Sequence, residues 1–317
     1  MQISIIMSVY NGSRYLRESI ESILNQTYRD FEFIIFDDAS TDDSASIIES
    51  YNDPRIVFIK NDKNYGLTLN LINGVQLAKG KYIARIDSDD VAFDKRLERQ
   101  IDYMETHTDI DVCGSLANAI DSNGRKRYII RVPVNDKEIK ENLIFGNCII
   151  HPSVMMRKSL FEKHQYDASF RTCQDYNLWS ECICDCTFAN LNEVLLGYRV
   201  NFDGISRSER KSPDKRYATL KTIYERNIGR RFNCLDDKEV TILSRVVSEL
   251  FTFQDKNEAK NAKIIIKKTT DGDVTSNEKR RLLLSYYRNS PHKLEFINSY
   301  FLRGAINSIV TKLKLLV

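Results

Sequence analysis

The 317-residue sequence lacks several features that define common classes of protein. It has no run of about 18 consecutive apolar residues, which excludes an ordinary membrane-spanning helix. The apolar stretch 1–10 is short and has no basic segment, unlike a secretory signal peptide. Internal repeats and low-complexity stretches are absent too. We therefore expect a folded cytoplasmic protein.

Two glycine-rich motifs that bind phosphate are also missing. No Gly-x-Gly-x-x-Gly follows the first apolar run, residues 3–9, which argues against a dinucleotide-binding dehydrogenase. The Gly-x-x-x-x-Gly-Lys-Ser/Thr motif of P-loop enzymes does not occur either. If this protein binds phosphate, another kind of site must hold it, and a metal on acidic side chains fits.

The seven cysteines include no Cys-x-x-Cys pair. Their odd number and irregular spacing favour reduced thiols over a disulfide framework. Cys182, Cys184 and Cys186 alternate, but a zinc site usually needs a Cys-x-x-Cys spacing and a second pair of ligands. We expect small free thiols at the end of a helix.

The charge is unevenly distributed. Residues 1–200 carry 23 Lys and Arg against 30 Asp and Glu, a net charge of −7. Residues 201–317 carry 24 against 14, a net charge of +10. The length and the 42% hydrophobic content suit one large α/β domain with an appended piece, and the charge asymmetry indicates two regions with different partners.

Buried-strand patterns alternate with helical patterns up to residue 110, which predicts a mainly parallel sheet with crossover helices. The expected strands are 3–9, 31–36, 55–60 and 82–86, and the expected helices are 13–24, 42–51, 66–78 and 94–106, the first capped by Ser13.

The alternation fails after residue 110. The expected elements are strands 112–120, 127–134, 151–157 and 187–200 and helices 136–144 and 174–184. We predict a catalytic domain over 1–208, with a nucleotide-binding half (1–110) and an acceptor-facing half (111–208), and a helical, basic extension over 209–317.

Three of the predicted strands end in polar residues: Tyr10-Asn11, Asp37-Asp38 and Asp87-x-Asp89. Parallel neighbours would bring these ends to one crevice. On a continuing strand, Asp87 and Asp89 would share a face. Neighbouring carboxylates repel, and a divalent cation removes that cost. This favours a metal–diphosphate site with Mg²⁺ or Mn²⁺, although a solvated acidic turn before a helix at Asp94 has the same pattern.

Several motifs in order resemble the inverting family 2 glycosyltransferases of the GT-A fold, and more narrowly the bacterial enzymes of surface-polysaccharide assembly. They are SVYNG (8–12), DDAST (37–41), NYGL (64–67), GKYIARIDSDD (80–90) and RLERQ (96–100). The resemblance covers roughly residues 2–200.

The resemblance implies roles for the acidic crevice. Tyr10 packs on uracil, Asp38 bonds the uracil edge, Asp87 binds ribose, and Asp89 ligates the metal on the diphosphate. Asp90 either supports the ligands or starts a helix, and Arg85 either neutralises the cluster or is a surface arginine with a packed stem.

The resemblance also implies a general base, because an inverting transfer must deprotonate the acceptor hydroxyl. The matching segment is CQDYNLWSE (173–181), and it makes Asp175 the base, in the first turn of a helix whose dipole favours its charge. Gln174 stands where the family usually has Glu. A capping aspartate would look the same. Trp179 one turn on is core or flanks an acceptor sugar.

Three further residues are candidates for contacts with the donor or its phosphates. His151 lies in the family-like segment NCIIHPSVMMRKS (147–159), although a lone His before Pro is more often structural. Arg199 and Arg207 lie in GYRVNFDGISRS (197–208), which resembles a loop that closes over the donor. Asn201 stands where relatives often carry a metal-binding His.

Residues 301–317 read as a basic amphipathic helix. Such a helix lies on an anionic membrane surface, or it packs on the catalytic domain or in a dimer interface. Both readings stay open, and oligomers are compatible with the sequence.

We therefore expect a cytoplasmic, metal-dependent inverting transferase, peripheral on the inner face of the membrane. Its substrates would be a UDP-sugar and a saccharide acceptor, lipid-linked in cell-surface polysaccharide synthesis, with no nucleic-acid partner. The sugar stays open among galactose, N-acetylglucosamine and N-acetylgalactosamine. The alternatives are a sugar-nucleotide nucleotidyltransferase, for which Tyr10–Ser13 supplies no basic glycine-rich loop, and a non-catalytic nucleotide-sugar binding module, against which Asp89 and Asp175 argue.

Overall fold

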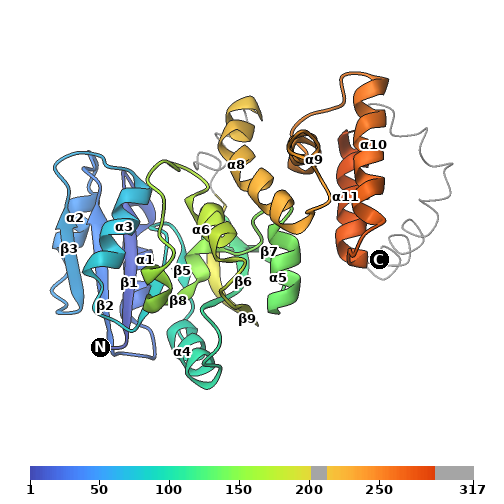
Figure 1. Ribbon diagram of the computed structural model, residues 1–317. Coiled ribbons are helices and arrows are strands. Elements are labelled where there is room, and N and C mark those ends of the chain that lie inside the picture. The colour runs from blue at the N-terminus through green and yellow to red at the C-terminus, as the bar shows by residue number, and fades with distance from the viewer. Residues whose placement is uncertain (201–212, 290–317) are drawn as a thin grey trace. The chain divides into compact units, whose positions relative to one another are not determined.

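A computed structural model describes residues 1–200 and 213–289 of the protein. The described residues form two compact units (Figure 1). The first comprises residues 1–143 and 147–200, and the second comprises 144–146 and 213–289. All residues of the predicted crevice that the structure describes lie in the first unit.

The first unit is built on one sheet. Within residues 1–200 the strand order is β3-β2-β1-β4-β8-β6-β9-β5, with β7 paired to β6. The strands are β1 (Ile3–Val9), β2 (Phe31–Asp37), β3 (Ile56–Lys60), β4 (Tyr82–Arg85), β5 (Val91–Ala92), β6 (Val112–Ile120), β7 (Lys126–Ile130), β8 (Met155–Arg157) and β9 (Phe188–Arg199). The helices of this unit are α1 (Ser13–Leu24), α2 (Ser44–Glu49), α3 (Leu67–Leu77), α4 (Arg96–Thr106), α5 (Asp136–Leu143) and α6 (Gln174–Cys182), with 3₁₀ turns η1 (His151–Ser153) and η2 (Lys158–Glu162).

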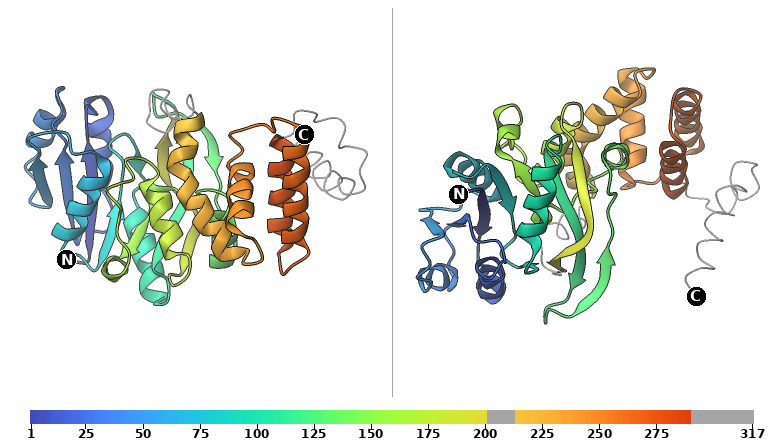
Figure 2. Two further views of the ribbon diagram at one scale, coloured as in Figure 1. Left: turned by 45° about the horizontal axis from the view of Figure 1, so that its top comes forward. Right: turned by 90° about the horizontal axis from the view of Figure 1, so that it is seen from below.

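The first half of the sheet has the predicted parallel arrangement. β2, β1 and β4 are parallel neighbours, with Val9 opposite Asp37 and Ile6 opposite Arg85. Alternate residues of β1 point to opposite faces, and Figure 2 shows helices on both faces of this part of the sheet. Ile5 belongs to the core beneath α1, α2 and α4, while Ile6 meets Gly74 of α3 so closely that a side-chain carbon there would lie 2.7 Å from its Cγ2. The carboxyl ends of these strands therefore share one edge.

The start of α1 differs from the prediction. Ser13 is the first helical residue, and Gly12 in the capping position offers no side-chain oxygen. The missing acceptors come from the loop after β2 instead: Asp42 Oδ2 accepts from Ser13 N at 3.0 Å, and Ser44 Oγ accepts from Gly12 N at 3.0 Å. Although burial raises the pKa of Asp42, the bonds from Ser44 and Ser13 outweigh it and lower the pKa to about 2. A long-range cap thus ties the ends of β1 and β2 together.

The second half of the sheet is mixed. β8 runs antiparallel to β4 and β6, whereas β6 and β9 are parallel. The strand expected over 151–157 begins with a 3₁₀ turn at His151–Ser153, because Pro152 has no N–H for a strand ladder. The strands expected over 187–200 are the single long strand β9.

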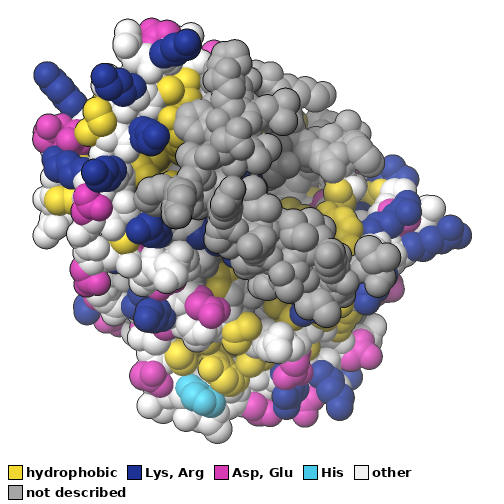
Figure 3. All heavy atoms as spheres, turned by 90° about the vertical axis from the view of Figure 1, so that its right-hand side faces the viewer, with side chains coloured by type: hydrophobic (Ala, Val, Ile, Leu, Met, Phe, Trp, Pro, Cys, Tyr) yellow, Lys and Arg dark blue, Asp and Glu magenta, His cyan; other side chains and the backbone are white. Residues whose placement is uncertain are grey.

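The second unit is helical as far as the structure describes it. Its helices are α8 (Pro213–Arg231), α9 (Asp237–Ser248), α10 (Lys256–Thr270) and α11 (Ser276–Asn289). Arg231 pairs with Glu278, whose side chain is fully buried, at 2.5 Å. Figure 3 shows Lys and Arg side chains interspersed with acidic and apolar ones among the described residues. No helix within 1–200 or 213–289 has the length and apolarity needed to cross a bilayer.

Candidate active site

The polar ends of β1, β2 and β4 touch one another, as their sequence pattern predicts. Asn11 N donates to Ser40 Oγ at 3.0 Å, and Thr41 N donates to Asn11 Oδ1 at 2.8 Å. On the other side, a side-chain carbon on Gly12 would lie 3.1 Å from Ser88 Oγ. The loop after β1 is thus packed between the loop after β2 and the acidic turn after β4.

Backbone strain gathers around this edge. Asn11, Ala39 and Cys173 have left-handed backbones, with φ of 51°, 60° and 57°. Asparagine tolerates this region, but for alanine and cysteine it costs about 1–3 kcal/mol. Asn11 and Ala39 follow strands of the crevice, and Cys173 precedes α6. The surrounding contacts hold these conformations and aim the residues that follow them.

The acidic residues meet through a turn, which corrects the expectation of a continuing strand. β4 ends at Arg85, and Asp90 N donates to Asp87 O at 3.3 Å to close a turn. Carboxylate oxygens of Asp87, Asp89 and Asp90 lie within 4.8 Å of one another. Such a set of hard oxygen donors fits Mg²⁺ or Mn²⁺.

The three aspartates differ in their surroundings. Asp87 and Asp89 are half-buried, whereas Asp90 is 1% exposed and accepts from Arg199 N at 2.7 Å. Burial raises the pKa of Asp90 well above its usual value, and the charges of Asp87 and Asp89 raise it further. Ser19 Oγ donates to Asp87 O at 2.9 Å. Asp90 therefore points inward and supports the turn, while Asp87 and Asp89 lie toward solvent.

Arg199 holds the acidic turn, and the expected phosphate contact is not supported. Its Nε donates to Asp89 O at 2.7 Å, its Nη1 to Asp121 O at 2.8 Å and its Nη2 to Glu18 at 2.6 Å. The guanidinium also lies 4.2 Å from the centre of the Tyr15 ring. The side chain is 1% exposed and these bonds hold all three of its nitrogen atoms, so we assign Arg199 a positioning role.

Arg85 neutralises the acidic turn from below. It is buried, unlike a surface arginine, and its guanidinium pairs with Asp87. Burial lowers the pKa of Arg85, but the carboxylates of Asp87 and Asp90 outweigh it and raise the pKa overall. Its Nη1 has no hydrogen-bond partner among the described residues. Of the two sequence readings, the charge-neutralising one is confirmed.

Asp175 lies in the first turn of α6, as predicted, and is half-buried. Asn147 Nδ2 donates to its Oδ2 at 2.6 Å. Burial raises the pKa of Asp175. The hydrogen bond from the Tyr176 amide, the charge of Arg85 and the hydrogen bond from Asn147 lower it, but the net shift is upward. Because Arg85 acts on Asp175 and also pairs with Asp87, the carboxylate of α6 and the acidic turn share one electrostatic neighbourhood. Asn147 was missed, although it opens a segment with family-like sequence.

His151 and Trp179 are buried and pack against each other. His151 is 6% exposed, its Nε2 lies 2.8 Å from the Tyr166 hydroxyl, and its ring meets the Trp179 ring edge-on. Burial holds the pKa of His151 well below its usual value, and the charge of Arg85 lowers it further. The structural reading of both residues therefore holds, and a direct phosphate contact from His151 is not supported.

The predicted base-binding residues behave differently from each other. Tyr10 is 53% exposed and free to pack on a planar ligand. Asp38 is buried, and its carboxylate accepts from Asn61 Nδ2 and from the amides of Tyr65 and Gly66, at 2.8, 2.9 and 2.8 Å. These bonds use three of about four acceptor positions. Asp38 thus anchors the loop before α3, and one acceptor position is left on its Oδ2.

Tyr198 of β9 is a second residue that the sequence did not reveal. Its side chain is half-buried, and burial raises the pKa of its hydroxyl. The charges of Asp87, Asp90 and Asp89 raise that pKa further. Tyr198 therefore lies beside the acidic turn. Arg207 and Asn201 lie outside the described residues.

Known proteins are similar to this chain in sequence and in fold. The family described as Glycosyl transferase family 2 matches residues 4–165. An uncharacterised glycosyltransferase of Methanocaldococcus jannaschii is 40% identical, over 69% of this chain and 78% of its own. The O-antigen biosynthesis glycosyltransferase WbnJ of Escherichia coli is 35% identical, over 65% of this chain and 82% of its own. The crystal structure of S. aureus TarS 1–349 in complex with UDP-GlcNAc has a TM-score of 0.62 at 18% identity, covering 91% of this chain and 88% of that one, which shows a shared fold.

Proposed function

The chain belongs to the family 2 glycosyltransferases of the GT-A fold, and on this basis we propose that it transfers a sugar with inversion from a UDP-sugar to a saccharide acceptor. One observation carries the proposal: Arg85 pairs with Asp87 of the acidic turn, and its charge also lowers the pKa of Asp175 of α6. A donor diphosphate on the turn and an acceptor hydroxyl at Asp175 would then meet over a short distance.

We assign the acid–base step to Asp175. Its carboxylate accepts the proton of the acceptor hydroxyl while that oxygen attacks the anomeric carbon from the face opposite UDP. A pKa raised by burial makes Asp175 a stronger base than an exposed aspartate. The bond from Asn147 orients the carboxylate and keeps one oxygen turned toward its amide.

The donor end is assigned to the strand ends of β1, β2 and β4. Tyr10 packs on the uracil ring and Asp38 offers its remaining acceptor position to the base edge, while Asp87 binds ribose. Asp89 would hold Mn²⁺ or Mg²⁺, which neutralises charge on the diphosphate as UDP leaves. Arg85 lies beneath the same turn, and its unpartnered Nη1 supports a role toward the donor phosphates.

Two comparisons support the class of substrate. TarS was crystallised with UDP-GlcNAc, and WbnJ is named for O-antigen biosynthesis. We therefore propose a uridine donor and an acceptor in the assembly of a cell-surface polysaccharide, carried on a lipid. The basic stretch 301–317, outside the described residues, would hold the enzyme at the membrane surface that carries this acceptor.

Donor hydrolysis tests the proposal without knowledge of the acceptor. Purified protein is incubated with UDP-galactose, UDP-N-acetylglucosamine or UDP-N-acetylgalactosamine, with Mn²⁺ and with a chelator, and the released UDP is measured. We expect slow, metal-dependent release from one donor, with a sugar product of inverted anomeric configuration by NMR. Tight UDP-sugar binding with no release from any donor and no transfer to a panel of saccharides would favour the non-catalytic binding module.

A further inference from the structure

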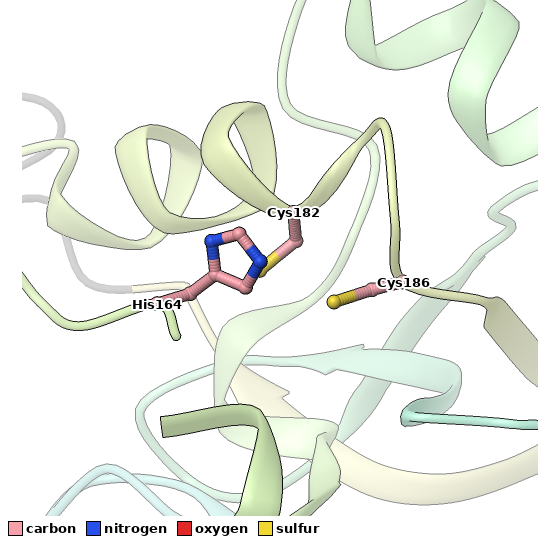
Figure 4. Close-up of side chains that lie close together, drawn as sticks. All are labelled: His164, Cys182 and Cys186. Carbon is pink, nitrogen blue, oxygen red and sulfur yellow. The ribbon is translucent and has the colours of Figure 1, made fainter. Parts of the chain in front are cut away.

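Three metal-binding side chains meet at the far end of α6, with the carboxylate of Asp185 beside two of them, where sequence spacing predicts only free thiols. Cys182 is the last residue of α6, Cys186 lies in the turn before β9, and His164 follows η2. One ligand atom from each lies within 4.8 Å of the others. Figure 4 shows the His164 ring beside the Cys182 sulfur, with the Cys186 sulfur pointing toward the same space. Asp185 Oδ1 joins them, 2.9 Å from His164 Nε2 and 4.0 Å from Cys186 Sγ.

We propose that Cys182, Cys186, His164 and Asp185 form a zinc site, separate from the acidic turn. Zinc takes four ligands in a tetrahedron and accepts thiolate, imidazole and carboxylate. At ordinary zinc–ligand distances, ligand atoms lie about 3.3–3.8 Å apart, so small side-chain rotations close this cluster around the ion. Magnesium and manganese prefer oxygen ligands. The two clusters of this protein therefore select different cations.

The surroundings suit a structural ion. Cys182 is 0% and Cys186 6% exposed, and the side chain of His164 is 15% exposed, so water is largely excluded. Asp185, at 43%, leaves the outer side open for entry of the ion. Asp111 and Asp185 both act on Cys182 electrostatically, which adds negative charge around the cluster. Cys184 lies between the two ligands in sequence, but it is exposed and outside the cluster.

The site joins three segments behind the proposed base. α6 carries Asp175 in its first turn and Cys182 at its end, about 10 Å apart along the helix axis. An ion held by Cys182 would fix this end of the helix to the His164 loop and to the turn that leads into β9. The zinc site touches none of the reacting groups, and its existence does not depend on the proposed transferase activity.

The competing chemistry is a redox pair, since the sulfurs of Cys182 and Cys186 lie within 4.8 Å of each other. A disulfide would use the two sulfurs alone, whereas the convergence of His164 and Asp185 on them is what a metal requires. The experiment below separates the two uses.

Metal binding to the full-length protein tests the proposal. The protein is reduced, freed of metal with a chelator, and titrated with Zn²⁺ in excess Mg²⁺, which occupies the acidic turn. Co²⁺ is then used as a spectroscopic probe, because thiolate ligands give sulfur-to-cobalt charge-transfer absorption. Cys186→Ser and His164→Ala remove ligands, and Cys184→Ser is the matched control. The thermal unfolding of each metal-free variant is compared with that of the metal-free wild type, which reports on folding separately.

We expect one zinc per chain, a tetrahedral thiolate spectrum with cobalt, and a higher unfolding temperature with zinc in the wild type and in Cys184→Ser. Zinc affinity should fall at least about 100-fold in Cys186→Ser and His164→Ala, since losing a ligand costs more than losing one of its outer partners. A cobalt complex without thiolate absorption, or wild-type zinc affinity in both ligand variants, would overturn the proposal. So would a Cys182–Cys186 disulfide that forms in air equally with and without zinc. If Cys186→Ser does not fold, the wild-type cobalt spectrum still decides.

Discussion

The side-chain amide of Asn147 donates a 2.6 Å hydrogen bond to Oδ2 of Asp175. Asn147 precedes the turn that carries His151, while Asp175 lies in the first turn of α6, and only the fold brings the two together. The bond favours the charged carboxylate, whereas burial opposes it, and burial is the larger effect because the pKa of Asp175 is raised. The strength of the proposed base is therefore set by opposing contributions, and mutation of Asn147 removes one of them.

Asn147→Ala should shift the acidic limb of the kcat/KM profile to higher pH. Removing the bond removes an effect that lowers the pKa of Asp175, so the carboxylate stays protonated, and inactive as a base, up to a higher pH. The matched control is Asn142→Ala, because the Asn142 side-chain amide donates to Glu138 O within α5 and not to Asp175. An acidic limb that does not move in Asn147→Ala would contradict this assignment.

Asp89→Asn and Asp175→Asn should fail in different ways. Loss of the metal ligand should weaken UDP binding in Mn²⁺ and leave the metal-free binding unchanged. Loss of the base should leave UDP binding intact and lower transfer by about 100-fold or more. Calorimetric UDP binding and transfer rates separate the two. Full turnover by Asp175→Asn would refute the base assignment.

Arg199→Lys should weaken Mn²⁺-dependent UDP binding by about 10- to 100-fold, the usual effect of losing a group that orients metal ligands. Lysine cannot reproduce the bonds of the guanidinium to Asp89 O, Asp121 O and Glu18. The control is Arg99→Lys, whose exposed pair with Glu193 also involves β9. If UDP binding without metal weakens equally, Arg199 contacts the nucleotide directly and the positioning role is wrong.

His151 should make the protein less stable in mild acid. Because its folded-state pKa is held well below the unfolded value of about 6.5, unfolding takes up a proton once the pH falls below that value. The free energy of unfolding should then drop by up to about 1.4 kcal/mol per pH unit, down to the folded-state pKa. His151→Gln should flatten this slope in urea titrations between pH 7 and 5, and His107→Gln, at the exposed end of α4, should keep it. An equal slope in His151→Gln would show that its titration is not linked to folding.

A chain ending before Phe301 should sediment less with anionic liposomes than the full chain does. The apolar stripe and the lysines of 301–317 supply the expected surface affinity. Neither chain should sediment with neutral liposomes. Equal sedimentation of the two chains would leave the stretch to intramolecular packing or to a dimer, which light scattering would distinguish.

Much of the nucleotide-binding half was predictable because its signals are local. The parallel direction of β1, β2 and β4 was predicted from apolar runs separated by helical segments, and parallel neighbours bring their polar ends to one edge. The position of Asp175 in the first turn of a helix followed from the resemblance. Two errors were local as well: Ser13 does not cap α1, and Asp87 and Asp89 meet through a turn.

By itself the sequence determined the family, the alternation of strands and helices, and the cluster of aspartates after β4, since each depends on residues that are neighbours in the chain. Only the tertiary structure decided that Arg199 holds the acidic turn, by binding Asp90, which lies 109 residues earlier in the chain. The pairing of Asn147 with Asp175, and the meeting of His164 with Cys182 and Cys186, likewise appeared only in the fold. Such contacts join segments that are distant in the chain. A polar side chain has no periodic sequence pattern from which its partner could be predicted.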